Sequence, residues 1–125
     1  MTQKAGFADV TNREGRKMNK KLKTNAVDRL FEAILTLQSQ EECYAFFEDI
    51  CTVNELLTFA QRYEVAYMLR QGKTYMEIAE KTGASTATVS RVNRSLNYGN
   101  DAYDMTFERM QAFAETKDAE QQPEA

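Results

Sequence analysis

The sequence contains no histidine, one proline and only two cysteines. Histidine is the commonest general base and a frequent zinc ligand, and no nucleophile in this chain stands near a base at a useful spacing. We therefore expect no enzyme, no metal site and no cofactor. The two cysteines, Cys43 and Cys51, are too few for a disulfide framework or a zinc site. They predict two reduced, buried thiols in a cytoplasmic protein.

Long apolar runs and turn-forming residues are also scarce. Nowhere do about 18 apolar residues follow one another, so we expect no membrane-spanning helix. The N-terminus is polar and basic, and it lacks the apolar stretch of a secretory signal. Five glycines and one proline, at position 123, favour helices over a sheet-rich fold. A length of 125 residues suits one domain with tails.

The charges are distributed unevenly along the chain, although its net charge of −3 is unusual for a protein that binds nucleic acid. Residues 1–23 carry seven basic and two acidic side chains (+5), and residues 70–97 carry five and two (+3). Residues 24–69 carry two and eight (−6), and residues 98–125 carry two and seven (−5). Because salt screens charge beyond about 10 Å, a local basic face can attract phosphate despite an acidic whole.

Apolar residues recur at helical spacing in six segments, which predicts an all-α fold of about six helices. Three helix starts carry capping boxes, formed by Ser39 with Glu42, Thr52 with Glu55, and Thr74 with Glu77. Glycine is expected to end the third helix, at Gly72. The expected helices cover about residues 27–37, 39–50, 52–70, 75–82, 86–97 and 101–115.

The segment from Tyr75 to Leu96 has the pattern of a helix-turn-helix, which we place at residues 74–97. Gly83 stands where a tight turn needs a left-handed backbone, and Ser85 can then cap the second helix. The apolar residues of this segment recur at the spacing of two helix faces that pack together. These inward residues are Ile78 and Ala79 in the first helix, and Val89, Val92 and Leu96 in the second.

The outer face of the second helix is suited to a DNA major groove. Small residues let the helix approach, hydroxyls can meet phosphates or base edges, and arginine can pair with guanine. This outer face consists of Thr86, Ala87, Thr88, Ser90, Arg91 and Arg94, with no acid among them. Ser85 and four flanking residues should lie near the DNA backbone: Lys73, Thr74, Tyr75 and Lys81. The simpler interpretation is an ordinary pair of helices joined by a glycine turn.

Large apolar side chains are abundant in the first three expected helices. One copy of so small a chain has little surface with which to cover them, so we expect a homodimer. Pairing would also place two reading helices about one DNA turn (~34 Å) apart. The alternative is a monomer with a self-sufficient core. The residues concerned include Phe31, Tyr44, Phe46, Phe47, Phe59, Tyr63 and Tyr67.

Both ends of the chain are polar and are expected to be disordered, at residues 1–23 and 116–125. The N-terminal tail is basic, with Lys or Arg at positions 13, 16, 17, 20, 21 and 23. It is either a solvated tail or an arm that contacts the DNA backbone.

Together, a helix-rich N-terminal half, a long helix ending near Gly72 and the sequence GASTATVSRVNRSL resemble the Trp repressor superfamily, and within it the YerC/YecD-like branch. The resemblance covers roughly residues 24–115 and is strongest over residues 62–96. It implies an all-α, intertwined homodimer that binds operator DNA as a transcriptional regulator.

In Trp repressor, tryptophan lies between two arginines, and the resemblance places these at Arg62 and Arg91. The next family position is a glycine that leaves room for the indole ring, whereas this chain has Val92. A valine there should clash with indole, so we do not expect tryptophan to be the co-repressor. Arg62 would instead pair with a carboxylate, and Arg91 could contact phosphate without any ligand.

The sequence therefore predicts a sequence-specific DNA-binding regulator, more typically a repressor, that partners double-stranded DNA as a homodimer. The alternative function is a protein-interaction module whose helix-turn-helix has lost DNA binding. Loss of DNA affinity with rising salt would distinguish the two, because phosphate contacts release counterions.

Overall fold

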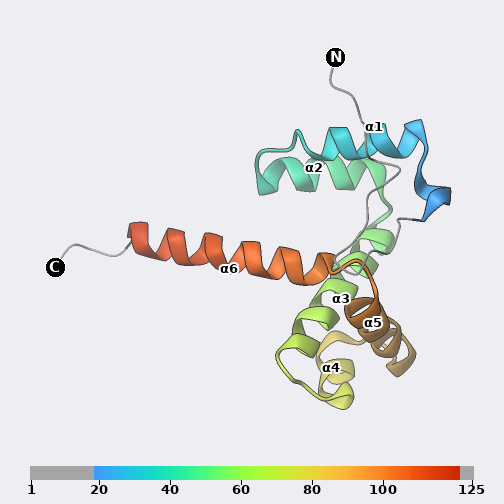
Figure 1. Cartoon of the computed structure of the whole chain (residues 1–125), viewed down its shortest axis with the longest axis vertical. Helices are drawn as coiled ribbons and strands as arrows, with labels where there is room; N and C mark the ends of the chain where they lie inside the picture. Colours follow the sequence, from blue (N-terminus) through green and yellow to red (C-terminus); the bar gives the residue numbers. More distant parts are fainter. Residues whose placement is uncertain (1–18, 122–125) are drawn as a thin grey trace. The chain divides into compact units, whose positions relative to one another are not determined.

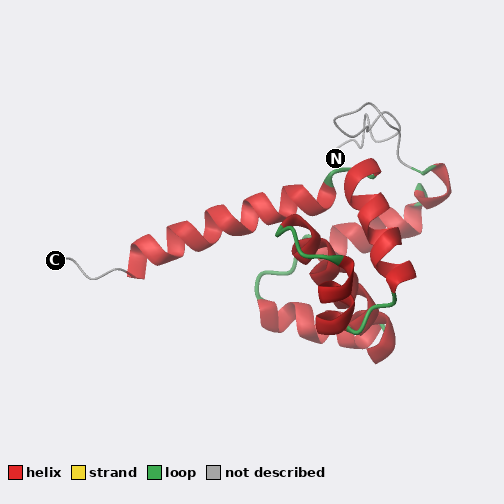
Figure 2. Ribbon diagram, turned by 90° about the horizontal axis from the view of Figure 1, so that it is seen from below, coloured by secondary structure: helices red, strands yellow, loops and turns green. Residues whose placement is uncertain are grey.

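The computed structural model describes residues 19–121, which contain six α-helices, one 3-10 helix (Lys20–Leu22) and no strand (Figures 1 and 2). This confirms the all-α prediction. None of the described helices is long and apolar enough to cross a membrane. The α-helices are α1 (Asn25–Ile34), α2 (Gln40–Ile50), α3 (Val53–Arg70), α4 (Tyr75–Thr82), α5 (Thr86–Tyr98) and α6 (Ala102–Gln121).

Two helix ends differ from the prediction. Helix α1 stops at Ile34 rather than at Leu37, since the backbone amides of Thr36 and Leu37 donate to carbonyls only three residues back, in a tighter turn. Helix α6 continues to Gln121 rather than ending at Glu115. Residues 116–121 contain no glycine or proline and are mostly good helix formers.

Of the expected disordered tails, residues 1–18 and 122–125 lie outside the described residues, whereas residues 116–121 belong to helix α6, so the expectation was wrong for them. The described part of the N-terminal tail begins with a short 3-10 helix, and Asn19 caps it through a bond from the Lys21 amide to its side chain (2.9 Å).

The chain divides into two compact units, at residues 1–59 and 60–125. The first unit holds α1, α2 and the first turns of α3, and none of its described residues is buried. Phe31 is 52% exposed and Tyr44 is 63% exposed. The expectation of buried thiols was wrong for the single chain, since Cys43 is exposed and Cys51 is half-buried. Two short helices offer too little surface to enclose side chains from every side.

The second unit contains the hydrophobic core. Its buried residues come from α3, from both helices of the predicted helix-turn-helix and from the turn between them. From α6, Tyr103 and Phe107 pack against this core. The predicted inward residues are buried, except Ala79, which is only half-buried. The core consists of Val65, Ala66, Met68, Ile78, Ala84, Val89, Val92 and Leu96.

Two of the three predicted capping boxes form completely. At α4 the Thr74 and Glu77 side chains each accept the other's backbone N–H, and Thr52 does the same with Glu55 at α3. The hydrogen bonds from the backbone and side chain of Thr52 hold the pKa of Glu55 below its ordinary value. The third box differs, as Ser39 caps α2 while the Glu42 carboxylate accepts from Gln38 instead.

Candidate nucleic-acid interface

The turn between α4 and α5 has the tight geometry expected of a helix-turn-helix. Gly83 adopts the left-handed conformation (φ 74°), and its N–H donates to the Ala79 carbonyl (2.9 Å). From α3, the Gln61 side chain donates to the Thr82 carbonyl (3.1 Å). The Thr82 hydroxyl donates to Ile78 and accepts from the Ala84 amide. These bonds satisfy the polar groups of the turn and fix where α5 begins.

Ser85 caps α5 and uses its hydroxyl for that purpose. Its oxygen accepts the Thr88 amide (3.1 Å), and its proton is donated to the Thr88 hydroxyl (3.0 Å). Thr88 is also half-buried. Among the predicted DNA-contacting residues at the start of α5, Ser85 and Thr88 therefore already use their hydroxyl groups in hydrogen bonds within the chain.

The rest of the outer face of α5 is exposed. Thr86, Ala87, Ser90, Arg91 and Arg94 all face solvent. Neither arginine has a hydrogen bond or ion pair with any described residue. The first turn of α5 contains no acidic residue, so it offers no competitor for these guanidinium groups. The helix thus presents the exposed cations Arg91 and Arg94 among small side chains.

The four predicted flanking residues are exposed on α4 or just before it. Lys73, Tyr75 and Lys81 are available at the surface, whereas the Thr74 hydroxyl is engaged in the capping box. Next to Tyr75, the Met76 side chain is 81% exposed and lies on the same surface, although its apolar character did not predict this. In the sequence, the position of Met76 in the first turn of the amphipathic helix α4 was the one feature that pointed to its exposure.

A small cleft separates Arg62 on α3 from Arg91 on α5; we call it the arginine cleft. Its volume is about 140 Å³, and its other lining residues are Thr88, Val92, Ser95 and Tyr103. Arg62 makes no hydrogen bond or ion pair with any described residue, so its expected carboxylate partner is not present within the described chain. Val92 is 3% exposed and also belongs to the core, as the inward-facing pattern predicted. Tyr103, on α6, also lines this cleft, and nothing in the sequence indicated that position.

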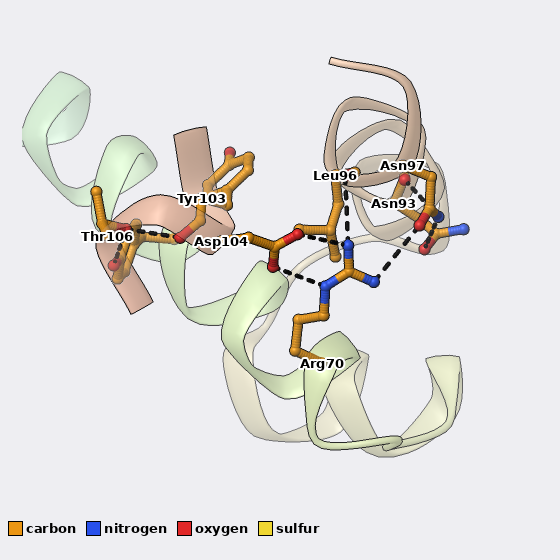
Figure 3. Close-up of polar contacts among 8 residues, drawn as sticks. Arg70, Asn93, Leu96, Asn97, Tyr103, Asp104 and Thr106 are labelled. Atoms are coloured by element: carbon orange, nitrogen blue, oxygen red, sulfur yellow. Dashed lines mark hydrogen bonds and ion pairs between the residues drawn. The ribbon is translucent and has the colours of Figure 1, made fainter. Parts of the chain in front are cut away.

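A second missed feature is the polar contact between Arg70 and the far end of α5 (Figure 3). The guanidinium of Arg70 reaches Leu96 and Asn97 on α5 and Asp104 on α6. Sequence spacing gave no signal for these contacts, because the partners lie 26 to 34 residues away.

Comparison with known proteins gives consistent matches. The Trp repressor protein family matches residues 25–111. The uncharacterized protein YerC of Bacillus subtilis (strain 168) is 59% identical over 90 residues, which are 72% of this chain and 86% of YerC.

Two solved structures share the fold. A TrpR-like protein from Eubacterium eligens ATCC 27750 is 67% identical with a TM-score of 0.73, and the match covers 74% of this chain and 96% of that protein. A Trp repressor candidate from Staphylococcus aureus is 58% identical with a TM-score of 0.72, covering 74% and 92%. The resemblance seen in the sequence is thereby confirmed, and this chain belongs to the Trp repressor family.

Proposed function

We propose that this protein is a sequence-specific DNA-binding transcriptional regulator, and a repressor, that reads the major groove with α5. The observation that carries this proposal is the outer face of α5, where Arg91 and Arg94 are exposed among small side chains and pair with none of the described residues. An exposed arginine fork can bond guanine in the groove or a phosphate beside it. Chromosomal DNA as the partner places the protein in the cytoplasm, and nothing in this site suggests catalysis.

The supports of α5 favour this function over a protein-interaction module. The second helix of a helix-turn-helix must hold its N-terminal residues toward base edges while its inner side stays packed. Here Val89, Val92 and Leu96 anchor the inner side, and the bonded turn at Gly83 fixes the start. The exposed Lys73 and Lys81 lie on the neighbouring element, where they can contact the flanking backbone.

We further propose that two copies form a homodimer. The described part of the first unit contains no buried residue, although it exposes Phe31, Tyr44 and Leu57. The second unit has an open groove of about 480 Å³, lined mainly by apolar side chains that include Tyr67 and Met110. Exposed apolar surface on this scale is typical of an interface between subunits, and a second copy is the partner always present.

Dimerisation is tested by sedimentation equilibrium of the full chain. We expect a mass twice the 14.3 kDa of one chain at micromolar concentration. Phe31→Glu should shift the protein toward monomer, because a carboxylate in an apolar interface carries a large desolvation cost. Arg29→Gln, on the same helix, is the matched control and should remain dimeric. A wild-type monomer with its full helical content would contradict the proposal.

DNA binding by this protein is proposed to need no tryptophan. The arginine cleft, at about 140 Å³, is smaller than the ~300–1,000 Å³ typical of small-molecule sites. Val92 and Tyr103 line the cleft between the two arginines and narrow it with side-chain atoms. Arg91 is exposed on the outer face of α5, so its guanidinium is accessible to phosphate.

A titration with fluorescently labelled duplex DNA tests the function. We expect binding that weakens at least tenfold between about 50 mM and about 200 mM salt, because phosphate contacts release counterions. Saturating tryptophan should leave the curves unchanged. Selection from random sequences should then return a palindrome with half-sites about one helical turn (~10 base pairs) apart. Absence of binding at low salt would favour the protein-interaction module, and a tryptophan requirement would contradict the effector-free mechanism.

A further inference from the structure

Arg70, the last residue of α3, forms a two-pronged bond with α6. Its Nε donates to one oxygen of the Asp104 carboxylate (2.8 Å), and its Nη2 donates to the other (2.9 Å). Such bidentate pairs constrain the angle between the two side chains as well as their distance. The bond to Asp104 raises the pKa of Arg70 further above its ordinary value, so the guanidinium is always charged.

The same guanidinium also reaches the C-terminal end of α5 (Figure 3). Nη2 donates to the Leu96 carbonyl (3.4 Å), and Nη1 donates to the Asn97 side-chain oxygen (3.5 Å). Asn97 is itself held by two bonds from its amide group to Asn93, one turn earlier. The carbonyls of the last helical turn lack intrahelical partners, and a cation is favourable there.

Helix α5 has no basic residue of its own in its last turn. Arg70 supplies that missing cation from α3, while Asp104 holds Arg70 in place from α6. The apolar contacts of Val92 and Leu96 hold α5 against the core, but apolar burial is non-directional. The hydrogen bonds at its C-terminal end are directional.

We propose that Arg70 is a positioning residue for the reading helix. Its fork onto Asp104 fixes the C-terminal half of α5 against α3 and α6, so that the chain's own side chains hold α5 in its DNA-binding orientation without a small-molecule effector. This inference rests on the proposed DNA-binding function, and it adds that the orientation of α5 is set by side chains of the protein itself. Binding is constitutive, because the clamp formed by Arg70, Asp104 and Asn97 consists of the chain's own side chains.

The Asp104→Asn substitution in the full chain tests this proposal, because the direction of the change in DNA affinity distinguishes the two explanations. Removing an acid raises affinity for DNA if charge alone matters, whereas loosening the clamp lowers it. We expect about tenfold weaker binding, as when only about a tenth of the molecules retain the competent orientation. Arg70→Gln should have the same effect. The salt dependence of binding should stay unchanged for both variants, because neither residue contacts phosphate.

Glu108→Gln is the matched control, since Glu108 is an exposed acid one turn further along α6. It should bind DNA as well as the wild type or slightly better. Because the Arg70–Asp104 pair is partly exposed, at 41% and 29% of the side chains, its loss should leave the thermal midpoint nearly unchanged.

Hydrogen exchange separates failure of this inference from failure of the proposed function. In Asp104→Asn, amides of residues 93–97 should exchange faster, while those of residues 86–89 should be unaffected. If the wild type binds no DNA, the proposed function fails, and hydrogen exchange still reports whether the clamp holds α5. If the wild type binds and Asp104→Asn binds equally well or better, Arg70 does not position the reading helix.

Discussion

The double variant Arg91→Ala/Arg94→Ala is expected to bind duplex DNA about a hundredfold more weakly than the wild type. A well-placed arginine contact contributes roughly 1–3 kcal/mol, and about 1.4 kcal/mol corresponds to a factor of ten. Both side chains are exposed and make no hydrogen bond or ion pair with the described residues, so their removal should leave the fold intact. Fluorescence anisotropy measures the affinity, and circular dichroism checks the helical content.

Salt dependence shows what each arginine contacts. If an arginine contacts phosphate, its removal should make DNA affinity depend less steeply on salt concentration. If it contacts a base edge, its removal should reduce the preference for the selected site over random DNA. Arg109→Ala, which removes an exposed cation from α6, is the matched control and should change affinity little. Wild-type affinity in the double variant would remove α5 from the interface.

Ile78→Ala is expected to destabilise the second unit by about 2–5 kcal/mol, since truncating a buried isoleucine removes apolar contact and leaves a cavity. Ile78 is fully buried at the centre of the α4–α5 pair, and it ranks with Leu96, Val65 and Val89 among the largest completely buried side chains. The measurement is the urea midpoint of unfolding at one fixed protein concentration.

Met76→Ala provides the control for this substitution on the same helix. Met76 is 81% exposed, so its truncation should change stability by less than about 0.5 kcal/mol. Similar losses for the two variants would show that α4 does not pack as described. A DNA affinity that falls with Ile78→Ala but not with Met76→Ala would link the core to the reading helix.

The helix-turn-helix could be predicted from the sequence because its determinants are local. Thr74 and Glu77 lie three residues apart, and the left-handed turn needs a glycine at one position, Gly83. The cap at Ser85 follows from the same short range. The burial of Val89 and Leu96 follows from helical periodicity alone. The DNA contacts assigned to the outer face stay a prediction.

Features that depend on distant residues could not be predicted in this way. Arg70 looks like an ordinary helix end in the sequence, and its carboxylate partner comes 34 residues later. The exposure of Cys43 reflects the lack of a core around α1 and α2, which periodicity does not reveal. The extra length of α6 was missed because polar composition was taken as a sign of disorder, although a polar helix can also form where helix breakers are absent.

The lack of buried side chains in the described part of the first unit has a consequence for the abundance of this protein in the cell. A newly synthesised chain whose aromatic groups remain in water is recognised by chaperones and proteases. If its lifetime depends on meeting a second copy, the supply of intact protein rises with the square of the synthesis rate at low expression. Modest changes in promoter strength would then produce a sharp onset of regulation.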